Sequence, residues 1–209
     1  MLLEKYSLKK VPVVARGDEW VFGQMLDAVA KFVGVTPLAK GLPPEQLYEK
    51  YKTVFEAGQR LARQFPADRI NDRVIPNRER LVRTLCYHVF RIGEAFLETW
   101  DGATYHEKMA DGLPPDALKT GDDIARHGEA IWKRYESWWA ALPDHTLERD
   151  LNTYYGTVDG AKVFERVTWH SAQHCRQLAA VLERMEIKPD RPLTAEDLKG
   201  LPLPERLFE

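Results

Sequence analysis

Several features that define other classes of protein are scarce or absent in this chain of 209 residues. Its two cysteines, Cys86 and Cys175, form no CxxC pair and no disulfide framework. No apolar run approaches the length that crosses a bilayer, and the first residues lack the uninterrupted apolar stretch of a signal peptide. We therefore expect a protein of the reducing cytoplasm that has no membrane partner.

An excess of charge of one sign is also missing. The chain has 30 Lys and Arg against 32 Asp and Glu, and its basic residues are scattered. A nucleic-acid-binding surface needs a concentrated basic stripe that releases counterions, so we expect no nucleic-acid partner. The hydrophobic content of 44% is ordinary for a globular protein, and the length suits one core with a small appendage.

The first 36 residues differ from the rest in their predicted secondary structure. VPVVA (11–15) and EWVF (19–22) are β-rich runs around Arg-Gly-Asp, which predicts a hairpin, and GQMLDAVAKFVG (23–34) has the apolar spacing of a short helix. The Pro- and Gly-rich TPLAKGLPP (36–44) is typical of a connector. We predict an N-terminal hairpin-helix extension over 1–36 and a second domain over 37–209.

The second domain has a helical pattern almost throughout. Apolar residues at spacings of three and four predict long amphipathic helices over 44–65, 77–100, 120–142 and 161–185. Pro44 suits a first helical turn, and Asn77 and Thr120 are expected caps. A short extended piece within 143–160 and a small helix at TAEDL (194–198) complete the prediction. The fold class is thus mainly α, a four-helix bundle with a small N-terminal β-hairpin plus helix, and its long connectors suggest that some cover a site.

The stretch WHSAQHCRQL (169–178) places His170 and His174 four positions apart in the last long helix. Both point from one face, roughly 6 Å apart along the axis, which is close enough for two ring nitrogens to bind one cation. The alternative is a pair of core histidines bonded to backbone or water. The zincin motif is excluded, because it needs Glu directly after the first histidine and Ser171 stands there.

A third metal ligand has to come from another helix. His88 lies in LCYHVFRIG, on an apolar stripe that should face the core. His106 and His145 fall in expected loops and His127 among charged residues, so we expect these three to face solvent. The cysteines next to the candidate ligands should point away from them. The sequence therefore predicts a metal site made by the histidines at 88, 170 and 174.

These residues carry a resemblance to a known family. A mid-helix histidine within IPNRERLVRTLCYHVFRI, followed far downstream by HSAQHCRQLAAVL, resembles the DinB-like (DNA-damage-inducible, YfiT-type) metalloprotein superfamily, and the match runs from about residue 44 to the end. The resemblance implies a four-helix bundle, often a homodimer, that holds one divalent metal, commonly zinc or nickel. By position, His88 matches the ligand of the second helix, and His170 and His174 match the pair of the fourth. Some members have Glu at the first of these two positions, so this chain has an all-histidine set.

The N-terminal segment resembles a different family. KVPVVARGDEWVFGQMLDAVAKFVG is similar to the last strand–strand–helix portion of a glutaredoxin-type domain, with Val-Pro at that family's cis-proline position. The half that carries the CxxC is absent, so no thiol–disulfide chemistry is expected. An ordinary hairpin-helix extension is the alternative.

Three neutral imidazoles around a metal with an open coordination position are typical of a catalytic site. The open position suits either a water that becomes a hydrolytic nucleophile or a thiol that loses its proton and attacks an electrophile. The resemblance favours the thiol, because family members include transferases and isomerases that use low-molecular-weight thiols. The face that bears the two C-terminal histidines also offers no Glu or Asp as a base for water. A metal-dependent hydrolase and a non-enzymatic, metal-stabilised bundle remain alternatives, and no catalytic residue is assigned.

A low-molecular-weight thiol, and many electrophiles, carry carboxylates. Arg166, one turn before the histidine pair, and Arg91, three residues after His88, are candidates to bind such groups bidentately. The alternative is that both reach solvent or pair with a neighbouring Glu. Tyr154 and Tyr155 precede the last long helix and are candidates for the pocket mouth.

Overall fold

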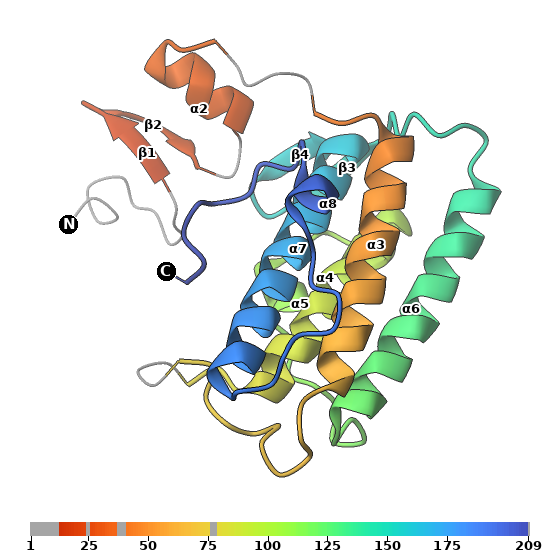
Figure 1. Cartoon of the computed structure of the whole chain (residues 1–209). Coiled ribbons are helices and arrows are strands. Elements are labelled where there is room, and N and C mark those ends of the chain that lie inside the picture. The colour runs from red at the N-terminus through yellow and green to blue at the C-terminus, as the bar shows by residue number, and fades with distance from the viewer. Residues whose placement is uncertain (1–12, 24–25, 37–40, 76–78, 209) are drawn as a thin grey trace. The chain divides into compact units, whose positions relative to one another are not determined.

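The computed structural model describes residues 13–23, 26–36, 41–75 and 79–208. The chain divides into two compact units, residues 1–41 and residues 42–209 (Figure 1). The division predicted after residue 36 falls next to residues 37–40, which lie outside the described residues. None of the described helices combines the length and the apolar character that a membrane span requires.

The N-terminal unit contains the predicted hairpin and helix. Strands β1 (Val13–Arg16) and β2 (Glu19–Phe22) pair antiparallel, and Gly17, with a φ of 64°, occupies the two-residue turn between them. Helix α2 (Leu26–Val33) packs against β2 and ends at Gly34, whose φ is 76°. Glycine adopts these left-handed conformations without a steric cost. The predicted hairpin is confirmed, and the helix predicted over 23–34 is confirmed over Leu26–Val33. Residues 11, 12, 24 and 25 are not described.

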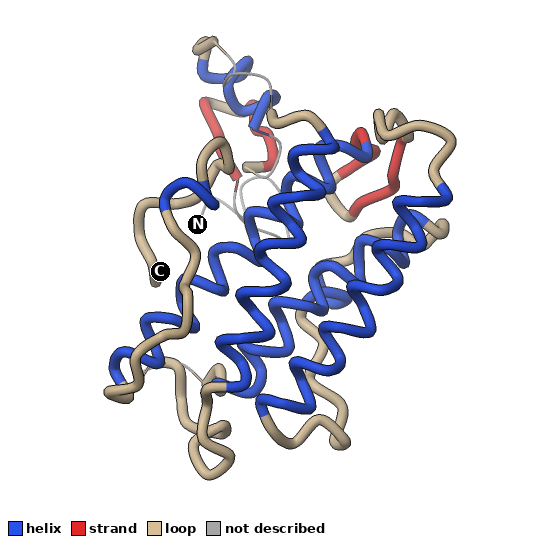
Figure 2. Tube along the Cα trace, turned by 45° about the vertical axis from the view of Figure 1, so that its right-hand side comes forward, coloured by secondary structure: helices blue, strands red, loops and turns tan. Residues whose placement is uncertain are grey.

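The larger unit is built on four long helices that lie side by side (Figures 1 and 2): α3 (Pro44–Arg63), α4 (Val82–Trp100), α6 (Gly121–Ala141) and α7 (Gly160–Arg184). Both α6 and α7 pack against α3 and α4. The connections hold a short helix α5 (Glu107–Ala110) and strands β3 (Asp150–Thr153) and β4 (Gly156–Asp159), and helix α8 (Ala195–Leu198) follows α7. The predicted mainly helical fold is confirmed.

Three of these helices begin where local side-chain chemistry favours a start. Pro44 occupies the first turn of α3, where its missing N–H costs nothing. Thr120 caps α6 as predicted, and it forms a reciprocal capping box with Asp123. The Asp159 carboxylate accepts hydrogen bonds from two backbone N–H groups in the first turn of α7. The start of α7, which carries two of the candidate ligands, is therefore set locally.

The start of α4 differs from the prediction. The helix begins at Val82, five residues after Asn77, which lies outside the described residues. The Val82 N–H donates to the Asp72 carbonyl (2.9 Å), and the Arg83 N–H donates to the Ile70 carbonyl (2.7 Å). The preceding loop thus satisfies backbone donors of the first turn, a task that the prediction gave to a side-chain cap.

The core between the helices is aromatic. Tyr51 and Phe55 of α3, Phe90 of α4, Tyr135 of α6 and Phe164 of α7 are all fully buried and pack edge to face or stacked. Burying each ring contributes on the order of 2–3 kcal/mol, and the ring pairs add to this. Because every long helix supplies at least one ring, this cluster packs all four helices against one another.

Strands β3 and β4 form a second hairpin where the sequence predicted a short extended piece. Gly156, with a φ of 123°, follows its turn. The hairpin is tied to the loop after α4, since the Tyr105 N–H donates to the Asn152 carbonyl (2.8 Å) and the Tyr154 N–H donates to the Tyr105 carbonyl (2.9 Å). Tyr154 and Tyr155 form the turn of this hairpin and are separated from α7 by strand β4.

The C-terminal segment, residues 185–208, runs back over the helices (Figure 1). The Gln64 amide donates to the Lys188 carbonyl (2.9 Å), and Lys50, near the other end of α3, donates to the Asp197 carbonyl (2.9 Å). The predicted small helix at TAEDL is α8, and Thr194 caps it. The segment is therefore held by side chains along the length of α3 before it returns to α7.

Candidate metal centre

Three histidines from two neighbouring helices meet in the larger unit. His88 lies in the middle of α4, and His170 and His174 lie one turn apart on α7, which packs directly against α4. The ring centroids of His88 are 5.4 Å from His170 and 4.7 Å from His174, and those of His170 and His174 are 4.8 Å apart. The structure thus brings together the three residues that the sequence singled out.

Ser171 fixes the register of the two helices at this level. Its hydroxyl donates to the Val89 carbonyl (2.8 Å) and lies 3.3 Å from the Tyr51 hydroxyl. Ser171 follows His170 and Val89 follows His88, so the bond joins the backbone positions next to two of the three histidines. Ser171, which stands where a zincin has its catalytic Glu, therefore has a structural role: it holds α7 against α4.

Burial keeps the two histidines of α7 neutral. Desolvation is the main cause that lowers the pKa of His174 to about 3. The proximity of the His88 ring and of Arg80 also lowers this pKa, and the hydrogen bond to Gln177 opposes the shift. Desolvation and the neighbouring histidines also lower the pKa of His170 well below its ordinary value. Neutral imidazole is the form that binds a metal ion, so no proton has to leave these rings near pH 7.

Two ring nitrogens of the cluster are buried and have no hydrogen-bond partner among the described residues. They are Nδ1 of His170 and Nε2 of His174. The other nitrogen of His174, Nδ1, lies 2.7 Å from the Gln177 side-chain oxygen. A buried polar atom without a partner is costly, and a cation bound to both nitrogens would remove that cost.

The spacing of the rings suits a single cation. One ligand nitrogen from each histidine lies within 4.8 Å of the other two, so a common point exists no more than about 2.8 Å (4.8/√3) from all three. Zinc binds imidazole nitrogen at about 2.0–2.1 Å. Small rotations of the rings would close the difference, and the three residues present therefore fit a divalent metal.

The same cluster contains no acidic or thiol ligand among the described residues. Cys86 and Cys175 are both buried, and the Cys175 thiol donates to the Val54 carbonyl of α3 (3.5 Å). Burial raises the pKa of Cys175 to about 12 and also raises that of Cys86. Both thiols therefore stay protonated and unreactive at neutral pH.

Arg166 lies one helical turn before His170, near the cluster. Its guanidinium carbon is 5.7 Å from the ring centroids of Tyr155 and of Trp169, and Trp169 in turn packs on His170. The Arg166 Nε is buried and has no hydrogen-bond partner among the described residues. Arg166 and Arg80 both lower the pKa of His170, so the cluster lies in a positive electrostatic environment.

The other two substrate-binding candidates have different surroundings. The Arg91 guanidinium donates to both oxygens of Glu98 (2.6 and 2.9 Å) and to Glu94 (3.0 Å). A substrate carboxylate would have to displace these partners, which makes the ion-paired alternative the observed one. Tyr155 is buried beneath Arg166, and Tyr154 packs edge to face on Tyr155.

The remaining histidines stay outside the cluster. His106 is exposed, as predicted. The expectation of a solvent-facing His127 is wrong, because its ring stacks on Tyr87 of α4 and it is half-buried. His145 is also packed, since its ring stacks on Trp139 at 4.1 Å. Tertiary packing of aromatic neighbours explains both differences.

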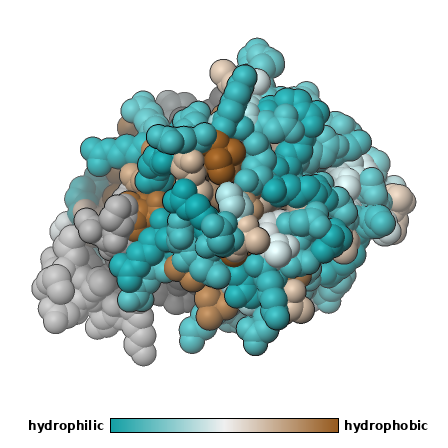
Figure 3. Space-filling model, turned by 60° about the horizontal axis from the view of Figure 1, so that its bottom comes forward, coloured by the Kyte–Doolittle hydropathy of each residue, from teal (hydrophilic) through white to brown (hydrophobic). Residues whose placement is uncertain are grey.

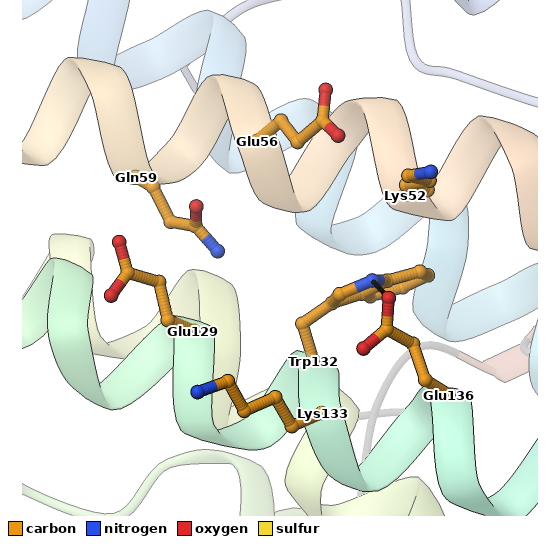
Figure 4. Close-up of a pocket in the computed structure, with 7 residues that line it drawn as sticks. All are labelled: Lys52, Glu56, Gln59, Glu129, Trp132, Lys133 and Glu136. Carbon is orange, nitrogen blue, oxygen red and sulfur yellow. Dashed lines mark hydrogen bonds between the residues drawn. The ribbon is translucent and has the colours of Figure 1, made fainter.

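A separate open groove of about 240 Å³ lies between α3 and α6 (Figure 4). Trp132 lies across it, and its indole N–H donates to Glu136 (3.2 Å). The other lining residues are all polar: Lys52, Glu56, Gln59, Glu129 and Lys133. None of the site residues predicted from the sequence lies in this groove.

Three residues of the candidate centre were assigned no role at the metal from the sequence: Arg80, Ser171 and Gln177. Ser171 was used there only to exclude a zincin. A Gln three residues after a candidate ligand is a detectable signal, because i and i+3 are neighbours on a helix. Arg80 gave no such signal, since its position depends on the loop before α4.

Comparison with known proteins returned no family model and no curated protein that matches this chain.

Proposed function

We propose that the unit of residues 42–209 is a DinB-like four-helix bundle that binds one divalent metal ion, zinc or nickel, through His88, His170 and His174. We further propose that it is a metal-dependent S-transferase-like enzyme acting on a low-molecular-weight thiol. The observation that carries the proposal is that one ring nitrogen from each of three histidines lies within 4.8 Å of the other two. In addition, one buried nitrogen of His170 and one of His174 lack a hydrogen-bond partner among the described residues.

The chain's own residues prepare this site for a metal and an anionic ligand. The low pKa of His174 and of His170 leaves their lone pairs available, and Ser171 holds their helix in register. A divalent cation bound here would supply Lewis acidity, which lowers the pKa of a bound thiol or water. Arg166, with its unpartnered Nε, and Arg80 favour a ligand that also carries a negative group such as a carboxylate.

A thiol is favoured over a hydrolytic water by what surrounds the histidines. No carboxylate joins the cluster among the described residues, so a general base for water is missing from that set. A thiol needs less assistance, since its pKa is already much lower than that of water. The positive charge of the two arginines would add to this by stabilising a thiolate.

The metal proposal is tested by metal content. The full chain should bind one equivalent of Zn²⁺ or Co²⁺ after chelator treatment and reconstitution, as measured by elemental analysis. His174→Ala should reduce occupancy to background, because it removes one of three ligands. His127→Ala is the matched control, since His127 is a half-buried helical histidine outside the cluster, and it should keep full occupancy. Full occupancy in His174→Ala would refute the assignment.

The thiol proposal is tested on the cobalt-substituted protein. Addition of 3-mercaptopropionate should produce an intense sulfur-to-cobalt charge-transfer band and should fail to do so in His174→Ala. A protein that binds cobalt but shows no spectral change with thiol would refute thiol activation. Hydrolase chemistry or a purely structural metal would then be favoured.

A further inference from the structure

The stretch of α7 that carries the histidine pair also binds residues 204–207 of the C-terminal segment. The Gln173 amide donates to the Arg206 carbonyl (3.1 Å) and to the Leu207 carbonyl (3.0 Å). Arg176, whose guanidinium also donates to the Gln173 oxygen (2.7 Å), binds the Pro204 carbonyl (3.1 Å). The segment 204–207 is therefore bound through backbone carbonyls. These hydrogen bonds do not depend on the side chains of the segment.

Gln177 belongs to both this contact and the histidine cluster. Its side-chain nitrogen donates to the Leu207 carbonyl (2.7 Å), while its side-chain oxygen lies 2.7 Å from Nδ1 of His174. A backbone carbonyl can only accept, so Leu207 fixes which end of the amide carries the NH₂ group. The amide oxygen then faces His174, and because an oxygen can only accept, Nδ1 of His174 must carry the proton.

The consequence for the cluster is a single form of the His174 ring. A neutral imidazole with its proton on Nδ1 has its lone pair on Nε2. Nε2 is the buried His174 atom that lacks a partner among the described residues. Ligand histidines are commonly oriented by a hydrogen bond to their other nitrogen, and here the acceptor is itself oriented by the C-terminal segment.

We propose that residues 204–207 act as a positioning element for the metal centre, in which the Leu207 carbonyl orients Gln177 and Gln177 sets the tautomer and ring orientation of His174. The metal part of this inference rests on the proposed function. The tautomer part does not, because it concerns the protein without metal. Without the relay, the ring could present either nitrogen to the cluster, and only one of the two orientations would suit a cation.

The first experiment measures the His174 tautomer by long-range ¹H–¹⁵N NMR in the metal-free full-length protein. Wild type should show the Nδ1–H form alone. Gln177→Leu should show a mixture of tautomers, and Gln173→Leu, which removes two donors to the C-terminal segment, should show a smaller admixture. Gln64→Leu is the matched control, because Gln64 also binds this segment through its amide, at Lys188, but contacts no histidine of the cluster. It should leave the tautomer unchanged.

The second experiment measures Zn²⁺ affinity by competition with a chelating dye. Gln177→Leu should weaken binding by about 10- to 100-fold, the usual effect of removing a group that orients a ligand histidine. Gln177→Glu keeps an acceptor for Nδ1–H and should restore affinity to within a few fold of wild type. Gln173→Leu should weaken binding in the wild-type background and have no further effect in Gln177→Leu, because both act through one relay. Gln64→Leu should bind as wild type does.

The two readouts separate failure of this inference from failure of the metal proposal. If wild type binds no metal, the proposed function fails, and the NMR result still decides whether the relay exists. A single unchanged tautomer in Gln177→Leu would overturn the relay. Unchanged zinc affinity in Gln177→Leu, with a shifted tautomer, would overturn the claim that the segment positions a metal ligand.

Discussion

At the scale of residues, the histidines of this chain differ by what surrounds each ring. His127 lies on a helix and is half-buried, as His170 is, but it stacks on Tyr87 and lies 4.0 Å from Glu94. The Nε2 of His127, like Nδ1 of His170 and Nε2 of His174, is buried and lacks a hydrogen-bond partner among the described residues. His170 and His174 differ because each of them faces other imidazoles. Whether a helical histidine can bind a metal ion therefore depends on its neighbours across the helix interface.

Arg166 gives a prediction about ligand charge. Replacing it by Gln should weaken binding of 3-mercaptopropionate to the cobalt-substituted protein by about 10-fold, since a charge-assisted hydrogen bond contributes about 1.5–3 kcal/mol. Binding of the uncharged 2-mercaptoethanol should change little. The measurement is titration of the charge-transfer band with each thiol. If binding of both thiols were weakened equally, Arg166 would not bind the carboxylate.

The sequence predicted which histidines meet, but not how they are oriented. Helical periodicity alone puts His170 and His174 on one face, and the apolar stripe of α4 turns His88 toward the core. The partner of Gln177 is a backbone carbonyl 30 residues further along the chain. Such a contact depends on the path of the C-terminal segment. Because every residue has a backbone carbonyl, the residue type at position 207 does not indicate this contact.

At the scale of elements, Ser171 connects three helices at the level of the candidate centre. Ser171→Ala should lower the free energy of unfolding by about 1–3 kcal/mol, because it removes a buried bond to the Val89 carbonyl and a partner of the buried Tyr51 hydroxyl. Chemical denaturation of the metal-free protein measures this.

Ser137→Ala is the matched control for that change. Ser137 is an exposed helical serine whose hydroxyl donates to the carbonyl one turn before it in its own helix (3.0 Å), so its loss should change stability by less than about 0.5 kcal/mol. Equal effects of the two substitutions would show that the Ser171 bond does not hold α7 to α4.

The starts of the long helices were predictable where a residue near the start in sequence favours it. Thr120 and Pro44 are local signals, and α6 and α3 begin beside them. The start of α4 was not predictable in the same way, because the groups that satisfy its first turn are carbonyls of the Ile70–Asp72 loop. A helix start that is satisfied by tertiary contact has no sequence signature of its own.

At the scale of the whole molecule, the buried imidazoles make stability depend on pH. In the unfolded chain, histidine takes up a proton as pH falls through about 6.5. In the folded protein the pKa of His174 is lowered to about 3 and that of His170 well below its ordinary value. Below pH 6.5 the unfolded state therefore binds more protons, and the free energy of unfolding of the metal-free protein should fall by about 1 kcal/mol per pH unit for each of these histidines.

Urea denaturation at pH 7, 6 and 5 measures this slope. His174→Gln removes one of the two groups and should flatten the dependence by about half of the histidine contribution. Comparison with this variant cancels the effect of carboxylates that titrate in the same range. A slope that is identical in wild type and in His174→Gln would contradict the assignment of a depressed pKa to His174.

The bonds from α7 to residues 204–207 have a reciprocal effect on the chain itself. Linkage is symmetric, so whatever factor the docked segment adds to the affinity for a cation, the cation returns to the docking of the segment. Cleavage within the segment by an added protease would then slow as the centre fills. The fraction of chains that escape this cut would record how much of the protein had acquired its ion.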